Sequence, residues 1–451
     1  MAANEPVLKS SLQHPARLVP LAFFVAIAIG TGLLLLPISK VGPGGTDFIT
    51  ALFTATSAVC VTGLIVVDTP TYWTGFGQGV ILALIQVGGF GIMTGSTLLG
   101  VLISRRLGLR TRIIAQAETR TLDLGDVTGV LRLIFVVTIL VELAIWAMLT
   151  ARLHLSYGEP LSQSIWNGLF HSISAFNNAG FSTYSDSLIG FANDWLFLGP
   201  IMLGVMIGGI GFPVLADLRR TLLHPGKWSL HTKITLLGTC ILLAVGTVAT
   251  LAYEAADTGA LGGLMTYPDR FLGALFHSVV TRTAGFNAID IGALQPETLL
   301  VTDVLMFIGG GSAGTAGGIK VSTALVLVLA VWAEIRGEPD TTAFGRRFST
   351  DVQRQALTLI VLATLAIALG TLHLLSVTSF SLEQVLFETI SAFATVGLST
   401  GITGNLPPSA ELTLVALMFI GRVGTITVAT GLALKRSQRP YRYPEERPIV
   451  G

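Results

Sequence analysis

Long apolar stretches separated by polar segments recur along the whole chain. Eight of them are long enough to cross the roughly 30 Å hydrocarbon core of a bilayer as helices. They lie at Leu18–Ile38, Gly77–Ile103, Thr128–Leu153, Trp195–Leu215, Ile234–Ala255, Val304–Val331, Ala356–Ser376 and Leu412–Leu434. An even number of crossings places both termini on one side of the membrane. The pattern therefore predicts an all-α integral membrane protein with eight transmembrane helices.

The basic residues follow every second apolar stretch. Four segments, 105–120, 219–233, 336–354 and 435–447, hold 18 of the 27 Lys and Arg residues. The segments on the other side are mostly acidic, with Asp68, Asp186, Asp194, Glu254, Asp257, Asp269, Asp290, Glu297 and Glu411. By the positive-inside rule, we expect the basic segments and both termini to be cytoplasmic.

Composition agrees with a membrane protein and excludes other classes. Hydrophobic residues make up 51% of the chain and charged residues only 12%, about half the charged share of a typical soluble domain. The net charge of +1 gives no indication of a nucleic-acid partner. The two cysteines, Cys60 and Cys240, are too few for a disulfide framework or a zinc site, and we expect them to act as small apolar residues.

A short, semi-polar motif lies between the two stretches of each pair and recurs four times. The copies are LFTATSAVCVTGL (52–64), LFHSISAFNNAGF (169–181), LFHSVVTRTAGF (275–286) and LFETISAFATVGL (386–398). Their glycines, Gly63, Gly180, Gly285 and Gly397, are 117, 105 and 112 residues apart. A second motif follows each copy: QVGGFG (86–91), MIGGIG (206–211), FIGGGSAG (307–314) and FIGRVG (419–424). Such a period predicts tandem repeats, with boundaries at 1–115, 116–225, 226–340 and 341–451.

Each repeat holds two crossings, so all four repeats share one orientation in the membrane. Parallel repeats are related by an axis along the membrane normal and can enclose a central path. We therefore expect four membrane–pore helix–membrane units in a pseudo-fourfold arrangement around one pore. This favours a pore over an alternating-access carrier, and a carrier on the same fold stays an alternative.

The short motif is a candidate selectivity filter. The segment from Phe170 to Phe176 has room for about two helical turns, so it must enter the membrane and return. Non-helical backbone at that depth is tolerated where it lines water or protein, and rings of carbonyl oxygens can replace the hydration shell of a cation. A lone glycine more often marks helix packing, but four in register favour a filter. The candidate K⁺ ligands are the backbone carbonyls of Val61, Thr62, Gly63, Asn178, Ala179, Gly180, Thr283, Ala284, Gly285, Thr395, Val396 and Gly397.

The sixth apolar stretch contains a glycine-rich run that predicts a break in the helix. We interpret it as a flexible intramembrane gating loop; a packing kink is the alternative. The candidate gate residues are Gly310, Gly311, Ser312, Ala313, Gly314, Thr315, Ala316, Gly317, Gly318, Lys320 and Arg422.

Arg422 stands in the column held by Gly89, Gly209 and Gly310 in the other repeats. A charge near mid-membrane costs at least about 2.5–3.5 kcal/mol. We expect it to face the pore as an electrostatic barrier; a salt bridge to Glu142 or to another buried acid is the alternative.

Three further charged residues lie in the glycine-rich run and in the pore segments. Lys320 is expected to neutralise nearby carbonyls or to hold the loop shut. Arg282 and Glu388 lie in the third and fourth pore segments, and an ion pair between them would brace the filter from behind.

At these residues the sequence resembles the Trk/Ktr/HKT superfamily of cation transporters, and most of all the membrane subunits of bacterial Ktr potassium uptake systems. The motifs that carry the resemblance are VCVTGL (59–64), RTAGFN (282–287), GTAGGIK (314–320), FATVGLSTG (393–401) and YRYPEERPIVG (441–451). The resemblance implies a homodimer with one pore per subunit and a cytoplasmic KtrA-type ring of nucleotide-binding domains that responds to ATP and ADP. It also implies uptake that sodium promotes, a loop and an arginine that gate the pore, and a preference for potassium, because all four glycines are kept.

Two other functions are alternatives to potassium uptake. A sodium- or proton-coupled symporter would need a carboxylate inside the spans, and Glu142 is the strongest candidate. A membrane enzyme would need a nucleophile, a base or a metal site, and no motif of that kind is present.

Overall fold

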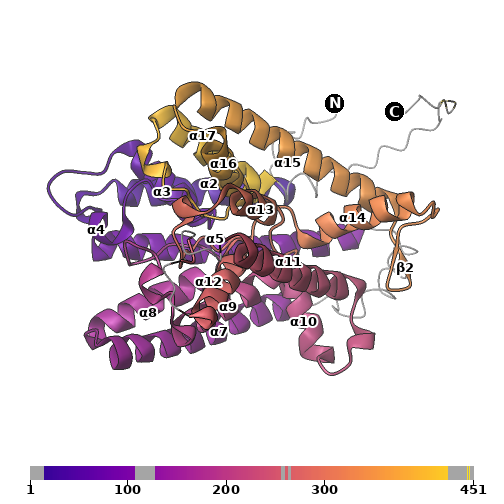
Figure 1. The fold of residues 1–451 in the computed structure, drawn as a ribbon, viewed down its shortest axis with the longest axis horizontal. Coiled ribbons are helices and arrows are strands. Elements are labelled where there is room, and N and C mark those ends of the chain that lie inside the picture. Colours follow the sequence, from indigo (N-terminus) through magenta and orange to yellow (C-terminus); the bar gives the residue numbers. More distant parts are fainter. Residues whose placement is uncertain are drawn as a thin grey trace, which may run out of the picture.

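The computed structural model describes residues 15–106, 127–254, 260–262 and 266–424, together with residues 444 and 446. These residues form an almost wholly helical molecule (Figure 1). The only strands are a two-residue antiparallel hairpin, β1 (Thr342–Ala343) and β2 (Arg346–Arg347), within the described part of the chain. The expectation of an all-α protein is thus confirmed.

The helices fall into four groups that follow the same order: a long helix, a short helix, and a further helix. The groups are α2 (Pro15–Leu34), α3 (Phe48–Val59) and α5 (Gly75–Arg106); α7 (Val127–Tyr157), α8 (Leu161–Phe176), α9 (Trp195–Ile210) and α10 (Phe212–Thr221); α11 (Leu230–Glu254), α12 (Tyr267–Val280), α13 (Pro296–Phe307) and α14 (Val321–Ile335); and α15 (Thr350–Val377), α16 (Leu382–Ala394), α17 (Pro408–Phe419) and the π-helical turn η6 (Ile420–Gly424). Connecting segments contain α4 (Thr69–Tyr72) and single 3₁₀ turns at Pro37–Ser39, Ile189–Phe191, Pro225–Lys227, Ile291–Ala293 and Thr403–Asn405.

The four groups close into a ring. Within each group the short helix packs on the preceding long helix, as α8 does on α7 and α12 on α11. Between groups, the third helix of one packs on the short helix of the next: α5 on α8, α9 on α12, α13 on α16 and α17 on α3. The last contact returns to the first group, so the short helices surround a common centre. The repeat boundaries stay a prediction, and the one at 115–116 lies outside the described residues.

Three of the four short helices, α3, α12 and α16, begin with polar caps, and all four end in the buried interior. The Asp47 carboxylate accepts hydrogen bonds from the backbone N–H groups of Ile49 and Thr50 at the start of α3. Ser381 and Gln384 form a capping box at the start of α16. The last two turns of α3, α8, α12 and α16 are almost wholly buried. Each short helix therefore directs its C-terminal end at the centre of the ring.

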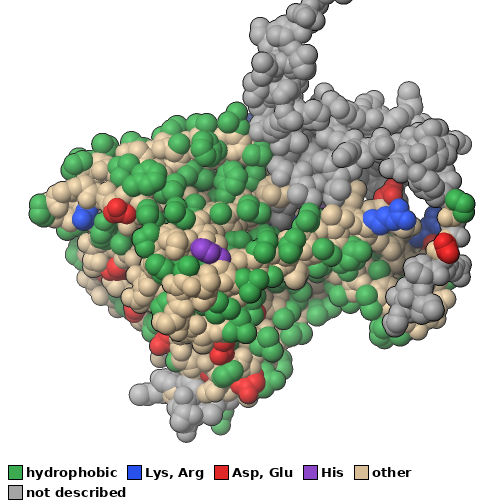
Figure 2. All heavy atoms as spheres, turned by 90° about the horizontal axis from the view of Figure 1, so that it is seen from above, with side chains coloured by type: hydrophobic (Ala, Val, Ile, Leu, Met, Phe, Trp, Pro, Cys, Tyr) green, Lys and Arg blue, Asp and Glu red, His purple; other side chains and the backbone are tan. Residues whose placement is uncertain are grey.

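Four helices are long and apolar enough to cross a membrane within the described residues: Gly75–Ser96, Leu131–Tyr157, Leu230–Glu254 and Thr350–Val377. A fifth crossing results if α9 and α10, which meet at an angle of 100°, count as one broken span. Hydrophobic side chains are spread over the described part of the face in Figure 2, and the charged side chains lie mainly toward its edges. The chain is a multi-pass membrane protein, while the count of eight spans and the side of the termini stay predictions.

Two predicted spans are not continuous helices. The stretch Val304–Val331 is broken between the end of α13 at Phe307 and the start of α14 at Val321, which confirms the break expected at the glycine-rich run. The stretch Trp195–Leu215 bends at Gly211, whose φ of +97° lies in the region that favours glycine. The span predicted there consists of two helices that meet at 100°, and its crossing of the membrane stays a prediction. Half of the eighth stretch, after Gly424, lies outside the described residues.

A buried carboxylate joins α7 to the start of α9 on the side of the acidic loops. Asp194 accepts hydrogen bonds from Arg152 Nε at 2.8 Å, from the Tyr157 hydroxyl at 3.0 Å and from the Leu196 N–H at 2.9 Å. Burial alone would raise the pKa of Asp194, but the hydrogen bonds from Arg152, Tyr157 and Leu196 outweigh it and lower the pKa.

We therefore predict that Asp194 stabilises the fold above the ordinary aspartate pKa of about 3.9 and that this stabilisation is lost as the pH falls through the lowered value. Asp194→Asn should cost about 2 kcal/mol at neutral pH, and the difference from wild type should shrink in acid. Thermal unfolding in detergent at several pH values measures this difference in stability between wild type and Asp194→Asn. Asp340→Asn, which breaks an exposed pair with Arg347, is the control and should cost less than about 1 kcal/mol; equal losses in both variants would contradict the prediction.

Candidate functional site

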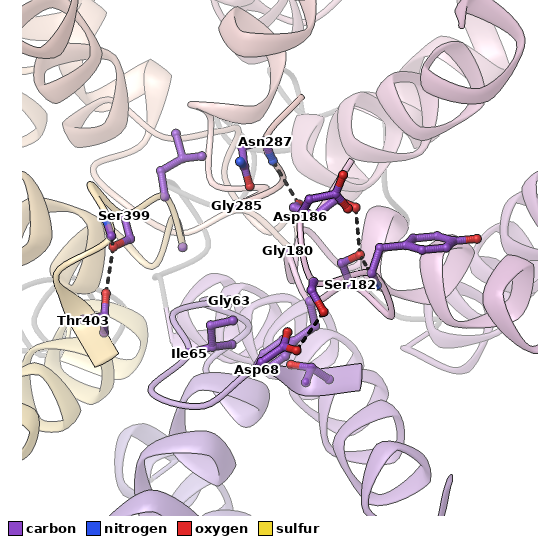
Figure 3. A pocket seen from close by; sticks show the side chains of 18 of the residues that line it. Gly63, Ile65, Asp68, Gly180, Ser182, Asp186, Gly285, Asn287, Ser399 and Thr403 are labelled. Carbon is purple, nitrogen blue, oxygen red and sulfur yellow. Dashed lines mark hydrogen bonds between the residues drawn. The ribbon is translucent and has the colours of Figure 1, made fainter. Parts of the chain in front are cut away.

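The four glycines of the repeated motif meet at the centre of the ring. A Cβ atom added at Gly180 would lie 2.7 Å from the carbonyl oxygen of Ala284, and one at Gly285 would lie 2.6 Å from that of Val396. A Cβ at Gly63 would overlap the carbonyl oxygen of Ala179, and one at Gly397 would overlap that of Thr62. Each glycine thus faces the carbonyl that precedes the glycine of the next repeat, and the fourth faces the first. Gly63, Gly180 and Gly285 lie around the centre of the view in Figure 3.

The backbone at the ring alternates in the sign of φ in every repeat. The residues two before the glycines have positive φ: Val61 at 56°, Asn178 at 59°, Thr283 at 74° and Thr395 at 51°. The glycines themselves have φ between 71° and 95°, and the residues between are not in this region. An alternation of this kind can turn successive carbonyl groups to one side of the chain, which an extended strand does not. Three of the four non-glycine residues are β-branched, for which this conformation costs on the order of 1–3 kcal/mol each.

Serine hydroxyls hold three of these segments against the short helices. Gly63 N–H donates to Ser57 Oγ at 3.1 Å, and Gly397 N–H donates to Ser391 Oγ at 3.1 Å. Ser57 Oγ and Ser174 Oγ donate in turn to the carbonyls of Leu64 and Phe181. The third repeat has Val280 at the corresponding place. These serines are not among the residues predicted for the filter, although all three stand four residues after the Phe of the repeated Leu-Phe pair.

A pocket of about 450 Å³ lies on one side of the glycine ring. Its lining includes the four glycines, the carboxylates of Asp68, Asp186 and Asp290, and the polar side chains of Asn287 and Ser399 (Figure 3). The Asp68 carboxylate accepts a hydrogen bond of 2.7 Å from Ser185, which ties the first repeat to the second. The pocket is therefore a polar, acidic approach to the ring.

The segment between α13 and α14 lies directly on the other side of the ring. Gly317 N–H donates to Thr283 Oγ1 at 3.1 Å, and Gly317 itself packs against Thr395. Thr315 Oγ1 lies 3.1 Å from both the Phe176 carbonyl and Asn178 Oδ1. The glycine-rich run therefore contacts the segments of the second, third and fourth repeats that precede their glycines.

The same run fills the end of α9. The N–H groups of Gly311 and Thr315 donate to the carbonyls of Gly209 and Gly208 at 2.8 and 3.0 Å. These carbonyls would otherwise be left unpaired where the helix stops at Ile210. A Cβ at Gly311 would overlap the Ile210 carbonyl. This close approach of two backbones explains the glycines in both MIGGIG and FIGGGSAG.

Two cations contact the run, the half-buried Lys320 and the buried Arg422. Lys320 Nζ donates to the carbonyls of Ala316 at 2.5 Å and Gly317 at 3.4 Å, so it lies where we expected it to neutralise carbonyls. Arg422, on the π-helical turn η6 and only 2% exposed, donates from Nη1 to the Thr315 carbonyl at 2.6 Å. Its Nε and Nη2 have no partner among the described residues. The roles of both residues stay predictions.

The expected ion pair between Arg282 and Glu388 is wrong. Arg282 donates to the Thr239 carbonyl at 3.1 Å, and Glu388 accepts from the hydroxyls of Ser399 and Thr403 and from the Thr400 N–H, so they do not pair. The alternative salt bridge of Arg422 to Glu142 does not form either, because Glu142 binds the amides of Gln86 and Asn177.

The remaining expectations concern length, metals and cysteines. The short helices have 12 to 16 residues, which is longer than the two turns expected. Among the described residues, no group of three or more His, Cys, Asp or Glu could hold a metal, and both cysteines are free.

The chain is similar over nearly its whole length to known cation transport proteins. Residues 23–441 match the family described as TrkH, cation transport protein. The chain is 39% identical over 448 residues to "Ktr system potassium uptake protein B" of Bacillus subtilis (strain 168), with 99% of each chain covered. It is 34% identical to "Potassium/sodium uptake protein NtpJ" of Enterococcus hirae, with 97% of each covered. The resemblance that the motifs indicated, to a Ktr membrane subunit, is confirmed.

A solved structure shares the fold. The crystal structure of the potassium transporter TrkH from Vibrio parahaemolyticus superposes with a TM-score of 0.73 and covers 94% of this chain and 86% of its own, at 18% sequence identity. At that identity the match concerns the architecture alone. It places this chain among all-α membrane proteins of the same general arrangement.

We predict that a methyl group at the ring disrupts the site. Gly397→Ala combines the strain of a positive φ, about 1–2 kcal/mol, with overlap on the Thr62 carbonyl, and should lower rubidium uptake into proteoliposomes by roughly tenfold or more. Gly337→Ala has the same kind of φ, +68°, with nothing within 4 Å, and should keep uptake near wild type. Similar uptake by the two variants would show that the ring tolerates a side chain.

Proposed function

Because the chain belongs to the TrkH family of cation transport proteins, we propose that it carries potassium ions across the membrane along the axis of the four-glycine ring. The single observation that carries this proposal is the closed ring of glycines and carbonyls, one from each repeat. Two relatives, from Bacillus subtilis and Enterococcus hirae, are named as potassium or potassium/sodium uptake proteins.

The chemistry of the ring suits a dehydrated monovalent cation. Rings of backbone carbonyls can replace the water around such an ion. The C-terminal ends of α3, α8, α12 and α16 add their partial negative charge at the same place. Each repeat supplies a short filter around one glycine, so discrimination against sodium is weaker than in a filter with more carbonyl rings.

The acidic pocket is the outer mouth in this proposal. The carboxylates of Asp68, Asp186 and Asp290 line it, and focused negative potential raises the local concentration of cations. The basic segments then lie in the cytoplasm together with both termini, as the positive-inside rule requires.

The glycine-rich run between α13 and α14 is the gate. It lies against Asn178, Thr283 and Thr395 on the inner side of the ring, and Arg422 and Lys320 hold its carbonyls. The Arg422 guanidinium adds a positive charge next to the ion path. Passage then requires that the run move and that this barrier weaken.

The proposal also includes a homodimer, a cytoplasmic partner and an effect of sodium. The Ktr names of the relatives imply a multi-component system, and we expect a homodimer on a cytoplasmic KtrA-type ring that binds ATP or ADP. Sodium is expected to promote uptake, and one relative is named for potassium and sodium together.

The test is rubidium flux into proteoliposomes that contain the purified chain. We expect flux that rises with rubidium concentration, follows an imposed voltage, and is inhibited by potassium more than by sodium. Liposomes without protein are the control. Flux that needs a sodium or proton gradient would indicate a coupled symporter, and no flux under any gradient would contradict the proposal.

We predict that Arg422→Ala raises flux. Removing the guanidinium abolishes its repulsion of cations, and even about 1 kcal/mol of repulsion corresponds to roughly fivefold in rate. It also frees the Thr315 carbonyl, which loosens the gate. The measurement is rubidium influx and sodium leak, with the exposed Arg336→Ala as the control. Unchanged flux in Arg422→Ala would count against the barrier.

A further inference from the structure

Three polar side chains meet behind the second repeat's filter segment, at the junction of α5, α7 and α8. Glu142 comes from α7, Gln86 from α5 and Asn177 from the end of α8. Glu142 is 6% exposed and Asn177 is fully buried. A carboxylate in such a place is costly unless its oxygens find donors.

Both oxygens of Glu142 accept hydrogen bonds from amides. Gln86 Nε2 lies 3.3 Å from Oε2, and Asn177 Nδ2 lies 3.2 Å from Oε1. Asn177 Nδ2 also lies 2.8 Å from Gln86 Oε1, which closes the triangle. The arrangement suits an ionised carboxylate, which only accepts hydrogen bonds.

No neighbouring charge compensates Glu142 among the residues whose side chains are described. The elements packed on this part of α7 are α5, α8 and α9. Among their described side chains, α5 and α9 carry no charged residue, and α8 carries only His171, which binds Asn167 and Ser182. On α7 itself, Arg132 and Arg152 are ten residues away, or about 15 Å along the helix.

The other repeats lack this cluster. Gln86 stands in the column occupied by Met206, Phe307 and Phe419. Gly89 makes room for the cluster, because a Cβ there would overlap Asn177 Oδ1. The polar groups thus occupy a position that three repeats fill with apolar side chains.

The cluster connects to both the filter and the gate. Asn177 is the C-cap residue of α8, and Asn178, which follows it, has a φ of +59°. Asn178 Oδ1 accepts the hydrogen bond from Thr315 at 3.1 Å, and the carbonyl of Thr315 accepts the one from Arg422. The position of Asn177 therefore sets the position of the gate's contact with the ring.

We propose that Glu142 is a positioning residue for the filter segment of the second repeat, and that a proton on Glu142 weakens potassium transport. The inference rests on the proposed function. A proton on either carboxylate oxygen turns an acceptor into a donor, so one amide loses its partner. Asn177 then loses part of its anchor, and Asn178 no longer holds the inner side of the ring in place.

The test compares wild type with Glu142→Gln, which keeps the size of the side chain and removes its charge. We expect wild-type rubidium flux to fall as the pH is lowered, and Glu142→Gln to be roughly tenfold lower at neutral pH, less selective against sodium, and insensitive to pH. Glu338→Gln, an exposed carboxylate at 45% exposure, is the matched control and should follow wild type. A Glu142→Gln variant with the wild-type pH profile and selectivity would overturn the proposal.

A second variant covers the case in which Glu142→Gln does not fold. Gln86→Met introduces a methionine, the residue that stands in the same column in the second repeat as Met206. The change removes one donor to the ionised carboxylate of Glu142. We expect its flux–pH profile to move to higher pH, because the charged form is then less favoured. An unmoved profile would overturn the proposal.

A readout independent of transport separates this inference from the proposed function. Potassium that binds the ring should raise the unfolding temperature of purified wild-type protein, and this rise should be smaller in Glu142→Gln and unchanged in Glu338→Gln. If wild type shows the rise without flux, the proposed function fails and the thermal comparison alone decides on Glu142. An equal rise in all three proteins would overturn the role of Glu142.

Discussion

The structure depends on bringing four non-helical backbone segments together inside a membrane protein. Unpaired main-chain groups cost several kcal/mol each in hydrocarbon, so such segments persist only where their polar groups have partners. Here the segments meet glycine to carbonyl around a closed ring, and the N–H groups of Gly63 and Gly397 bind serines of the short helices. In the proposed function, a cation is the partner of the ring carbonyls.

Close backbone contact continues from the ring to the run between α13 and α14, which we propose as the gate. The run between α13 and α14 lies against the ring on one side and against the end of α9 on another, and a Cβ at Gly311 or Gly317 would overlap a neighbour. Thr315 joins these contacts: its N–H binds Gly208, its hydroxyl lies between Phe176 and Asn178, and its carbonyl binds Arg422. A movement of the run must therefore break contacts with the ring, so the proposed filter and the proposed gate are physically coupled.

Much of this arrangement could be predicted from the sequence, and the misses have physical causes. The ring could be predicted because four glycines recur at a nearly fixed period, each after a Leu-Phe pair. The helix break could be predicted from the glycine-rich run Gly309–Gly318. The serine at Ser57 and Ser391 was overlooked because a serine in an apolar helix usually binds its own helix. The predicted ion pair of Arg282 and Glu388 rests on their opposite charges. In the structure a carbonyl accepts the hydrogen bond of Arg282, and hydroxyl groups donate to Glu388, so each side chain has other partners. The positive φ of Val61, Thr283 and Thr395 was not predictable, because only the ring imposes it on β-branched residues.

The most direct measurement of the central claim is an experimental structure of the protein in rubidium salt, with anomalous scattering used to locate the ion. We expect a rubidium peak on the axis of the ring, in contact with the carbonyl oxygens of Thr62, Ala179, Ala284 and Val396. A map in which those four carbonyls point away from a common axis, or in which rubidium lies elsewhere, would contradict the account.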